Sequence, residues 1–150
     1  MVSETEDAID VGILSDLVGY HLRRATNAVV ADFARALADT GIRQVLFGVL
    51  SVVERNPGIN QGSVGKGLGI QRANMVALVN ELVERGLVDR RVSTEDRRAF
   101  ALSLTEEGKL AYADCLARIR AHEDDVLSGL DTRERNRLIA LLSRIEASED

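Results

Sequence analysis

Two hydrophobic periodicities alternate along the chain and divide it into helices and strands. An apolar side chain every three or four positions is typical of a helix with one buried face, and apolar side chains at alternate positions are typical of a half-buried strand. The sequence therefore predicts helices over residues 10–39, 43–55, 61–68, 71–85, 109–130 and from 132 onward, and strands over 87–92 and 97–105. The fold class that follows is mainly α with one small β-hairpin.

The middle of the chain contains two short helices joined by a tight turn. Asn60 is suited to cap the first helix, because its side chain can accept a hydrogen bond from a backbone N–H of the opening turn. Gly69 and Ile70 form the turn, and Gly86 supplies a residue that can adopt a positive φ just past the second helix. The residues that define the predicted buried face of the second helix are Met75, Val76, Val79, Leu82 and Val83.

The two strands that follow form a hairpin with a polar, cationic tip. Val88 and Val92 share one face of the first strand. The residues that share one face of the second strand are Phe100, Leu102 and Leu104. Thr105 is predicted to cap the next helix, whose first turn is acidic. A pair of short helices followed at once by a hairpin is the arrangement of a winged helix-turn-helix.

Side chains at the start of the second short helix have the chemistry of DNA readers, because a helix in the major groove brings its N-terminal side chains to the base edges. Gln71 and Asn74 are amides that can bond adenine bidentately, and Arg72 can bond guanine or a phosphate. Arg97 and Arg98 at the hairpin tip are candidate contacts to the DNA backbone or the narrow minor groove. Lys66 and Thr94 are candidate contacts to phosphates. The alternative is a solvated helix start and an ordinary polar hairpin tip.

One segment carries a more specific pattern. Residues Asp96–Thr105 read DRRAFALSLT, which matches DxRxxxLxLT. This resembles the wing signature of the MarR family of bacterial transcriptional regulators. The segment Leu68–Val76, LGIQRANMV, is similar to the start of that family's recognition helix. The resemblance implies that Asp96 holds a wing arginine in place. One departure is Gln71, where the family often has Ser, Thr or Asp, and a glutamine caps a helix poorly.

The likeness covers nearly the whole chain in helix order and spacing. It implies one MarR-like domain over residues 1–150, with a winged helix-turn-helix over about 43–105 and dimerisation helices over about 10–40 and 109–150. Both end regions are long and amphipathic, and a compact winged helix does not need them. Their apolar faces favour a homodimer in which these helices pack against their copies.

A candidate ligand site follows from the same resemblance. Many MarR-like proteins bind small aromatic acids between the first, second and fifth helices. Tyr20, His21, Arg24 and Phe47 suit a phenolic carboxylate, since they offer rings to stack on and cations for the anion. The effector expected here is a small aromatic acid or its thioester. The alternative for His21, which lies on the apolar stripe, is a core or interface histidine satisfied by a neighbour.

The charge of the chain is unevenly distributed. The net charge is −5, which is unusual for a protein that binds DNA. Between Gly65 and Arg98, however, seven Lys or Arg residues stand against five Asp or Glu residues, and the rest of the chain carries twelve against nineteen. The basic excess therefore falls where the DNA would lie.

Other functional classes find little support. No phosphate-binding loop, catalytic triad or paired-carboxylate context is present, so the sequence predicts no enzyme and no cofactor. Cys115 is predicted to be a small buried residue. A metal site is not expected, although Glu123 and Asp124 adjoin His122. The acidic start and the absence of a long apolar run predict a cytoplasmic protein that does not enter the membrane.

The predicted function is that of a sequence-specific regulator of transcription. It would bind a pseudo-palindromic operator in double-stranded DNA as a repressor, and a small phenolic ligand would release it. The alternative is a winged helix that binds a protein instead of DNA. Such a module would tend to lose its wing arginines, whereas both are present here.

Overall fold

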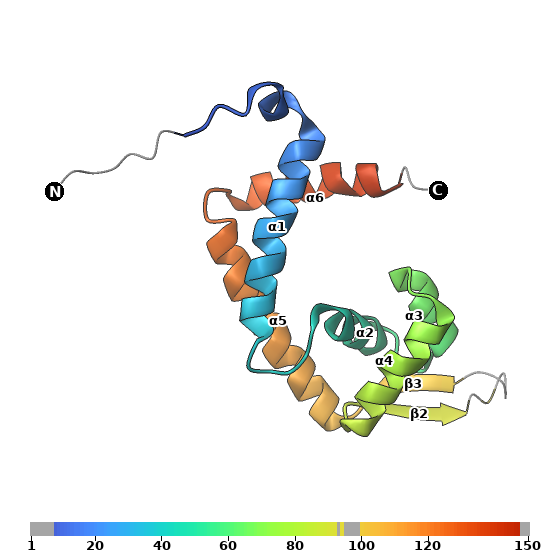
Figure 1. Cartoon of the computed structure of the whole chain (residues 1–150). Helices are drawn as coiled ribbons and strands as arrows, with labels where there is room; N and C mark the ends of the chain where they lie inside the picture. The colour runs from blue at the N-terminus through green and yellow to red at the C-terminus, as the bar shows by residue number, and fades with distance from the viewer. Residues whose placement is uncertain (1–7, 93, 95–99, 148–150) are drawn as a thin grey trace.

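Two long helices, α1 (Val18–Leu37) and α5 (Glu106–Val126), lie side by side and connect the two ends of the molecule (Figure 1). At one end, α6 (Thr132–Glu146) crosses this pair. The computed structural model describes residues 8–92, 94 and 100–147. The other end is formed by α2 (Gln44–Arg55), β1 (Ile59–Asn60), α3 (Gln61–Leu68), α4 (Arg72–Glu84), β2 (Val88–Val92) and β3 (Phe100–Leu104).

The predicted fold class, mainly helical with a small β wing, is confirmed. The strands form an antiparallel sheet in the order β1–β3–β2, with Ile59 opposite Leu102 and Val88 opposite Leu104. The hairpin of β2 and β3 was predicted, but β1 was not. A strand of two residues shows no periodicity of its own, and it exists because β3 offers an edge to pair with.

The helix-turn-helix is stabilised by the local features that the sequence predicts. The Asn60 side chain accepts a hydrogen bond of 2.7 Å from the backbone N–H of Ser63. Gly69 ends α3 with φ 66°, a left-handed conformation that favours glycine. The two helices also approach closely at Gly65. A Cβ there would lie 2.7 Å from Cγ of Met75 and 3.0 Å from the carbonyl oxygen of Ile70, so the crossing requires a residue without a side chain.

The hydrophobic core lies almost entirely in the winged helix-turn-helix end. Its largest fully buried side chains include Leu46, Leu50, Met75, Leu82 and Leu102. The prediction of the buried face of α4 was wrong in one position: Val76 is 42% exposed, and Leu78 is buried in its place. The hydrophobic spacing alone is compatible with burial of either Val76 or Leu78. Packing against α3 and the sheet determines that Leu78 is the buried residue.

The start of the first helix also differs from the prediction. Residues Gly12–Asp16 form a 3₁₀ turn, η1, and the extended residue Leu17 separates it from α1, which begins at Val18 rather than near Asp10. The Asp10 carboxylate accepts a hydrogen bond of 2.8 Å from Gly12 N–H, and Gly12 has φ 61°. Both features favour a turn over a continuous α-helix.

The helices after the wing begin as predicted. The Thr105 hydroxyl accepts a hydrogen bond of 2.9 Å from Gly108 N–H at the start of α5. Asp131 and Glu134 form a capping box at the start of α6, with two reciprocal hydrogen bonds of 2.8 Å. The helix α5 ends at Val126, earlier than the predicted Leu130. Among the described residues, no helix is long and apolar enough to span a membrane.

Candidate nucleic-acid interface

The helix α4 has one buried face and one solvent-exposed face. Met75, Leu78, Val79 and Leu82 point into the core, whereas Arg72, Asn74 and the small residues Ala73 and Ala77 are exposed. Gln71 is the residue before the helix, is exposed, and makes no side-chain capping hydrogen bond. Its amide is therefore not engaged in capping, as its poor capping chemistry predicts.

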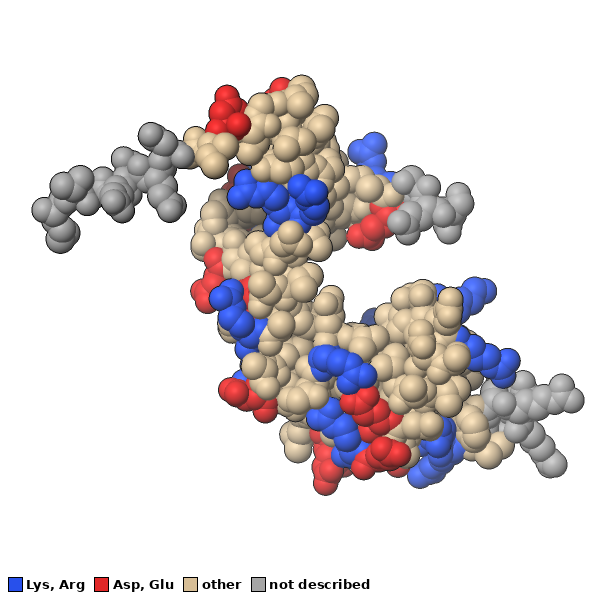
Figure 2. All heavy atoms as spheres, in the orientation of Figure 1, with Lys and Arg blue, Asp and Glu red and all other residues tan. Residues whose placement is uncertain are grey.

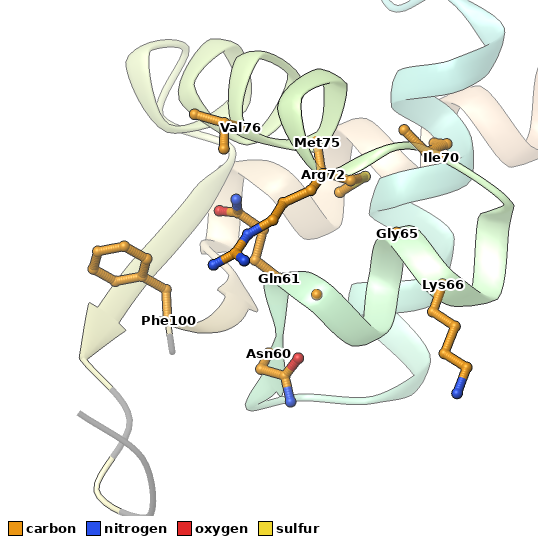
Figure 3. Close-up of a pocket in the computed structure, with 10 residues that line it drawn as sticks. Asn60, Gln61, Gly65, Lys66, Ile70, Arg72, Met75, Val76 and Phe100 are labelled. Carbon is orange, nitrogen blue, oxygen red and sulfur yellow. The ribbon is translucent and has the colours of Figure 1, made fainter. Parts of the chain in front are cut away.

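A cavity of about 590 Å³ lies beside the first turn of α4, between α3, α4 and β3. Its lining includes Arg72, Gln61 and Phe100, and Figure 3 shows the Arg72 guanidinium beside the Gln61 amide with Phe100 across from them. Lys66, from α3, extends outward (Figure 3). Within the described part of the chain, Gln61 Oε1 is buried and has no hydrogen-bond partner. This oxygen is an acceptor that a nearby donor can satisfy.

The predicted base-reading residues fall on two flanks of α4. Arg72 lines the cavity toward α3 and the wing, whereas Gln71 and Asn74 line a shallow groove next to Arg43 at the start of α2. The outward face between these flanks carries Ala73, Val76 and Ala77, which are all exposed. Apolar side chains in the major groove can contact the methyl group of thymine. The structure therefore adds an apolar component to the polar readout that the sequence predicts.

The wing is attached to α4 by an arginine that the sequence motifs do not include. Arg90 Nη1 donates a hydrogen bond of 2.6 Å to Asn80 Oδ1, and its guanidinium carbon lies 5.1 Å from the centre of the Phe100 ring. A guanidinium over an aromatic face is an attractive arrangement. Arg90 thus contacts α4 and both strands of the wing. The sequence feature that could have indicated this role is the position of Arg90, a basic residue on the same strand face as Val88 and Val92.

Between β2 and β3, the structure describes Thr94 alone. Thr94 is exposed between β2 and β3, where a phosphate can reach it. Asp96, Arg97 and Arg98 lie outside the described residues.

Two arginines attach α4 to the segment between α1 and α2. Arg43 donates hydrogen bonds of 2.8 and 2.9 Å to the two carboxylate oxygens of Glu81. Arg85 Nη1 donates a hydrogen bond of 2.8 Å to the carbonyl oxygen of Gly41. The hydrogen bond from Arg43 lowers the pKa of the Glu81 carboxyl and raises the pKa of Arg43, because each charged form is stabilised by the other. We call Arg43, Glu81 and Arg85 the α2–α4 clamp.

The structure does not bring the four predicted ligand residues together. Tyr20, His21 and Arg24 cluster near the start of α1, where Arg24 Nη1 donates a hydrogen bond of 3.4 Å to Tyr20 Oη. Phe47 instead stacks on Tyr112 and meets the edge of Phe33, at ring distances of 5.5 and 6.2 Å. Phe33 lies thirteen residues after Tyr20, so Phe47 is about 20 Å farther along α1. The sequence predicted one cluster of these four residues, whereas the structure separates them into two groups.

His21 also has a different environment from the predicted apolar one. Its side chain is exposed, and Nε2 lies 2.7 Å from the carbonyl oxygen of Ser15 in η1. The break before α1 places that carbonyl within reach of the ring. His21 is thus satisfied by the backbone within one chain and does not require a ligand.

Two apolar cavities adjoin the long helices. One, of about 440 Å³, lies between the end of α1 and the start of α2, and its lining includes Val30, Phe33, Ile42 and Arg43. We call it the α1–α2 cavity. The other, of about 230 Å³, lies between α1, α5 and α6. At its edge His122 Nδ1 is 3.2 Å from Asp32 Oδ1.

The remaining predicted features are structural. Cys115 is fully buried, and burial raises the pKa of its thiol, so the group stays protonated and unreactive. Within the described ranges, no three His, Cys, Asp or Glu side chains converge on a point that suits a metal ion.

On the face shown in Figure 2, some basic side chains lie along the outer edge of the winged helix-turn-helix end, and others lie over α1. The outer face of α4, the polar residues on its flanks and the adjoining basic edge are the parts of a surface that binds DNA. The fold and this surface define the class: a winged helix-turn-helix DNA-binding protein.

Comparison with known proteins identifies the family. Residues 41–99 match the model of the MarR family. A putative transcriptional regulatory protein for the hcr operon of Thauera aromatica is 35% identical over 135 residues, which are 89% of this chain and 81% of that protein. The chain belongs to the MarR family and is a DNA-binding transcriptional repressor of that family, not an enzyme.

Two solved structures of repressors named CouR have the same fold. The transcriptional repressor CouR bound to a 23-mer DNA duplex is 36% identical, with a TM-score of 0.86 over 92% of this chain and 98% of that chain. CouR from Rhodococcus jostii RHA1 bound to p-coumaroyl-CoA is 32% identical, with a TM-score of 0.78 over 88% of this chain and 93% of that chain.

Proposed function

We propose that this repressor binds a pseudo-palindromic DNA operator as a homodimer and is released by an aromatic acid or its thioester. The observation that carries the DNA part is α4, whose inner face is buried while Arg72, Asn74 and Val76 face solvent. In a symmetric dimer, two such helices enter successive major grooves about 34–36 Å apart. The protein then acts where the chromosome is, in the cytoplasm.

The homodimer is supported by apolar side chains at the end of the molecule farthest from the winged helix. In one chain, α6 contributes no buried residue, and Ile139 is 60% exposed. At the start of α1, Val18 is 68% exposed. Apolar faces of this size on neighbouring elements are typical of a surface that a second subunit covers. The 230 Å³ cavity lies beside the same faces and is assigned to this dimer seam.

The α1–α2 cavity is proposed to hold the aromatic group of the effector. Its apolar lining suits a ring, and Arg43 at its edge suits the polar end of the ligand. Arg43 is also hydrogen-bonded to Glu81 on α4. A ligand that moves Arg43 therefore acts on the recognition helix through the α2–α4 clamp. The effector class is supported by the CouR structure with p-coumaroyl-CoA.

The test begins with selection of bound fragments from random DNA by the full-length protein. A recovered inverted repeat supports the proposed operator, and failure to enrich any sequence contradicts it. Release from the selected DNA is then measured by fluorescence anisotropy with p-coumarate and p-coumaroyl-CoA. Release by neither compound contradicts the effector class.

The dimer is tested separately with two lysine substitutions on α6. Leu141 lies on the apolar side, and Ala140 lies on the opposite side; both are exposed in one chain. Leu141→Lys should convert the protein to monomer in light scattering, and the control Ala140→Lys should stay dimeric. Two dimeric variants would show that α6 lies outside the dimer seam.

A further inference from the structure

A basic cluster near the start of α1 is not explained by DNA binding or by the dimer. Two guanidinium groups lie over the Tyr20 ring: the guanidinium carbons of Arg23 and Arg24 are each 5.8 Å from its centre. Both arginines are exposed, and among the described residues neither has an acidic partner within ion-pair distance. Figure 2 shows basic side chains over α1, away from the basic edge of the winged helix.

The proposed dimer leaves Arg23 of this cluster accessible. Residues of an α-helix are spaced about 100° apart, so Arg23 and Ala25 point to nearly opposite sides of α1. Ala25 belongs to the apolar stripe that also contains Val18. A partner subunit that covers the stripe therefore does not cover Arg23.

The same side of α1 leads to the α1–α2 cavity. Arg23, Asn27, Val30 and Ala34 follow one another at intervals of three or four residues and form a single row along the helix. Val30 and Ala34 line the cavity. Arg23 is seven residues from Val30, which corresponds to about 10 Å or two helical turns. An extended pantetheine arm is long enough to cover this distance.

We propose that Arg23, Arg24 and Tyr20 bind the nucleotide end of a CoA thioester whose aromatic group occupies the α1–α2 cavity. Guanidinium groups hold phosphates through charge-assisted hydrogen bonds, and the Tyr20 ring offers a face for the adenine. The solvated cluster suits the anionic part of the ligand, and the apolar cavity suits its ring. The inference rests on the proposed effector. A site for the nucleotide makes the protein selective for the thioester over the free acid.

The experiment compares two thioesters that share one aromatic group. p-Coumaroyl-CoA carries the nucleotide, and the p-coumaroyl thioester of N-acetylcysteamine does not. Their release midpoints are measured by fluorescence anisotropy on operator DNA with the full-length wild type, Arg23→Ala/Arg24→Ala, and Arg120→Ala as an exposed control on α5. The double variant should need about tenfold more p-coumaroyl-CoA, and the midpoint of the truncated thioester should not change. The control should match wild type with both.

The outcomes separate the two proposals. Equal loss of response to both thioesters in the double variant would overturn the nucleotide site, because the arginines would then act on the aromatic group or on the fold. An unchanged double variant would overturn it as well, while leaving the effector proposal intact. If wild type responds to neither thioester, the effector proposal fails and the nucleotide site fails with it. Arg23→Gln/Arg24→Gln replaces the double variant if DNA affinity without ligand shows that the alanine variant is misfolded.

Discussion

Arg43 and Glu81 join the segment that follows α1 to the recognition helix through two parallel hydrogen bonds of 2.8 and 2.9 Å. Arg43 precedes α2 and lines the α1–α2 cavity, and Glu81 lies three residues before the end of α4. A bidentate pair of this geometry fixes direction as well as distance. It connects the proposed effector cavity directly to the helix that reads DNA.

The first prediction concerns the transmission of the effector signal. In Glu81→Gln, binding of p-coumaroyl-CoA should persist, because Glu81 does not line the cavity, but release from DNA should weaken several-fold. The quantity to measure is the ratio of the DNA Kd with and without the thioester, since this ratio is the coupling between the sites. Glu84→Gln, an exposed position on the same helix, is the matched control. An unchanged ratio in Glu81→Gln would show that the signal travels by another route.

The second prediction concerns pH. The pKa of Glu81 is lowered in the folded chain, so the pair contributes stability above the ordinary carboxyl pKa and loses it as pH falls through the lowered value. Both partners are partly exposed, so the contribution at neutral pH is at most about 1 kcal/mol. Urea unfolding of wild type and Glu81→Gln should therefore differ at pH 7 and converge in the acidic range below the ordinary carboxyl pKa. A difference that persists there would mean that the substitution acts through packing.

The third prediction concerns apolar base reading by Val76. If Val76 contacts a thymine methyl group, replacing that thymine with uracil should weaken wild-type binding by about 1 kcal/mol, the value of one buried methyl group. Val76→Ala should be less sensitive to this replacement at every operator position. Asn74→Ala is the control and should keep the full uracil penalty. Competition binding with uracil-substituted operators measures the loss of affinity in the wild type and in both variants. An equal loss in the wild type and in Val76→Ala would show that Val76 does not read the thymine methyl group.

The fourth prediction concerns the wing arginines. Arg98→Ala should weaken DNA binding and reduce the slope of log affinity against log salt by about one unit, if the side chain neutralises one phosphate. Arg97→Ala should have a smaller effect. Arg118→Ala, on α5, provides the control for the change in net charge. Salt titrations in which Arg98→Ala keeps the wild-type slope would place this arginine away from the DNA backbone.

The fifth prediction concerns the crossing of α3 and α4. Gly65→Ala should destabilise the fold by about 1–3 kcal/mol, because the new Cβ would overlap Met75 and approach the Ile70 carbonyl. Gly67→Ala in the same helix has open space around the new Cβ. It should stabilise the fold by up to about 1 kcal/mol, since alanine favours a helix over glycine. Denaturant unfolding measures the free energy of unfolding of both variants. Equal changes in Gly65→Ala and Gly67→Ala would show that the close approach at Gly65 is unimportant for stability.

The sequence by itself determined the features that depend on short-range geometry. The caps at Asn60, Thr105 and Asp131 were predictable because each side chain hydrogen-bonds a backbone N–H three residues away. The hairpin and the order of the helices followed from hydrophobic period. The MarR pattern in the wing identified the family, because that motif lies in one continuous segment.

Only the tertiary structure decided the features that depend on neighbours distant in sequence. Val76 and Leu78 both fit the hydrophobic spacing of α4, and packing against α3 and the sheet determined which one is buried. Phe47 was grouped with Tyr20 by residue type, but its contacts with Phe33 and Tyr112 place it near the other end of α1. The α2–α4 clamp joins residues 38 positions apart. No local pattern encodes such a contact, because it forms only when the chain brings the start of α2 beside α4.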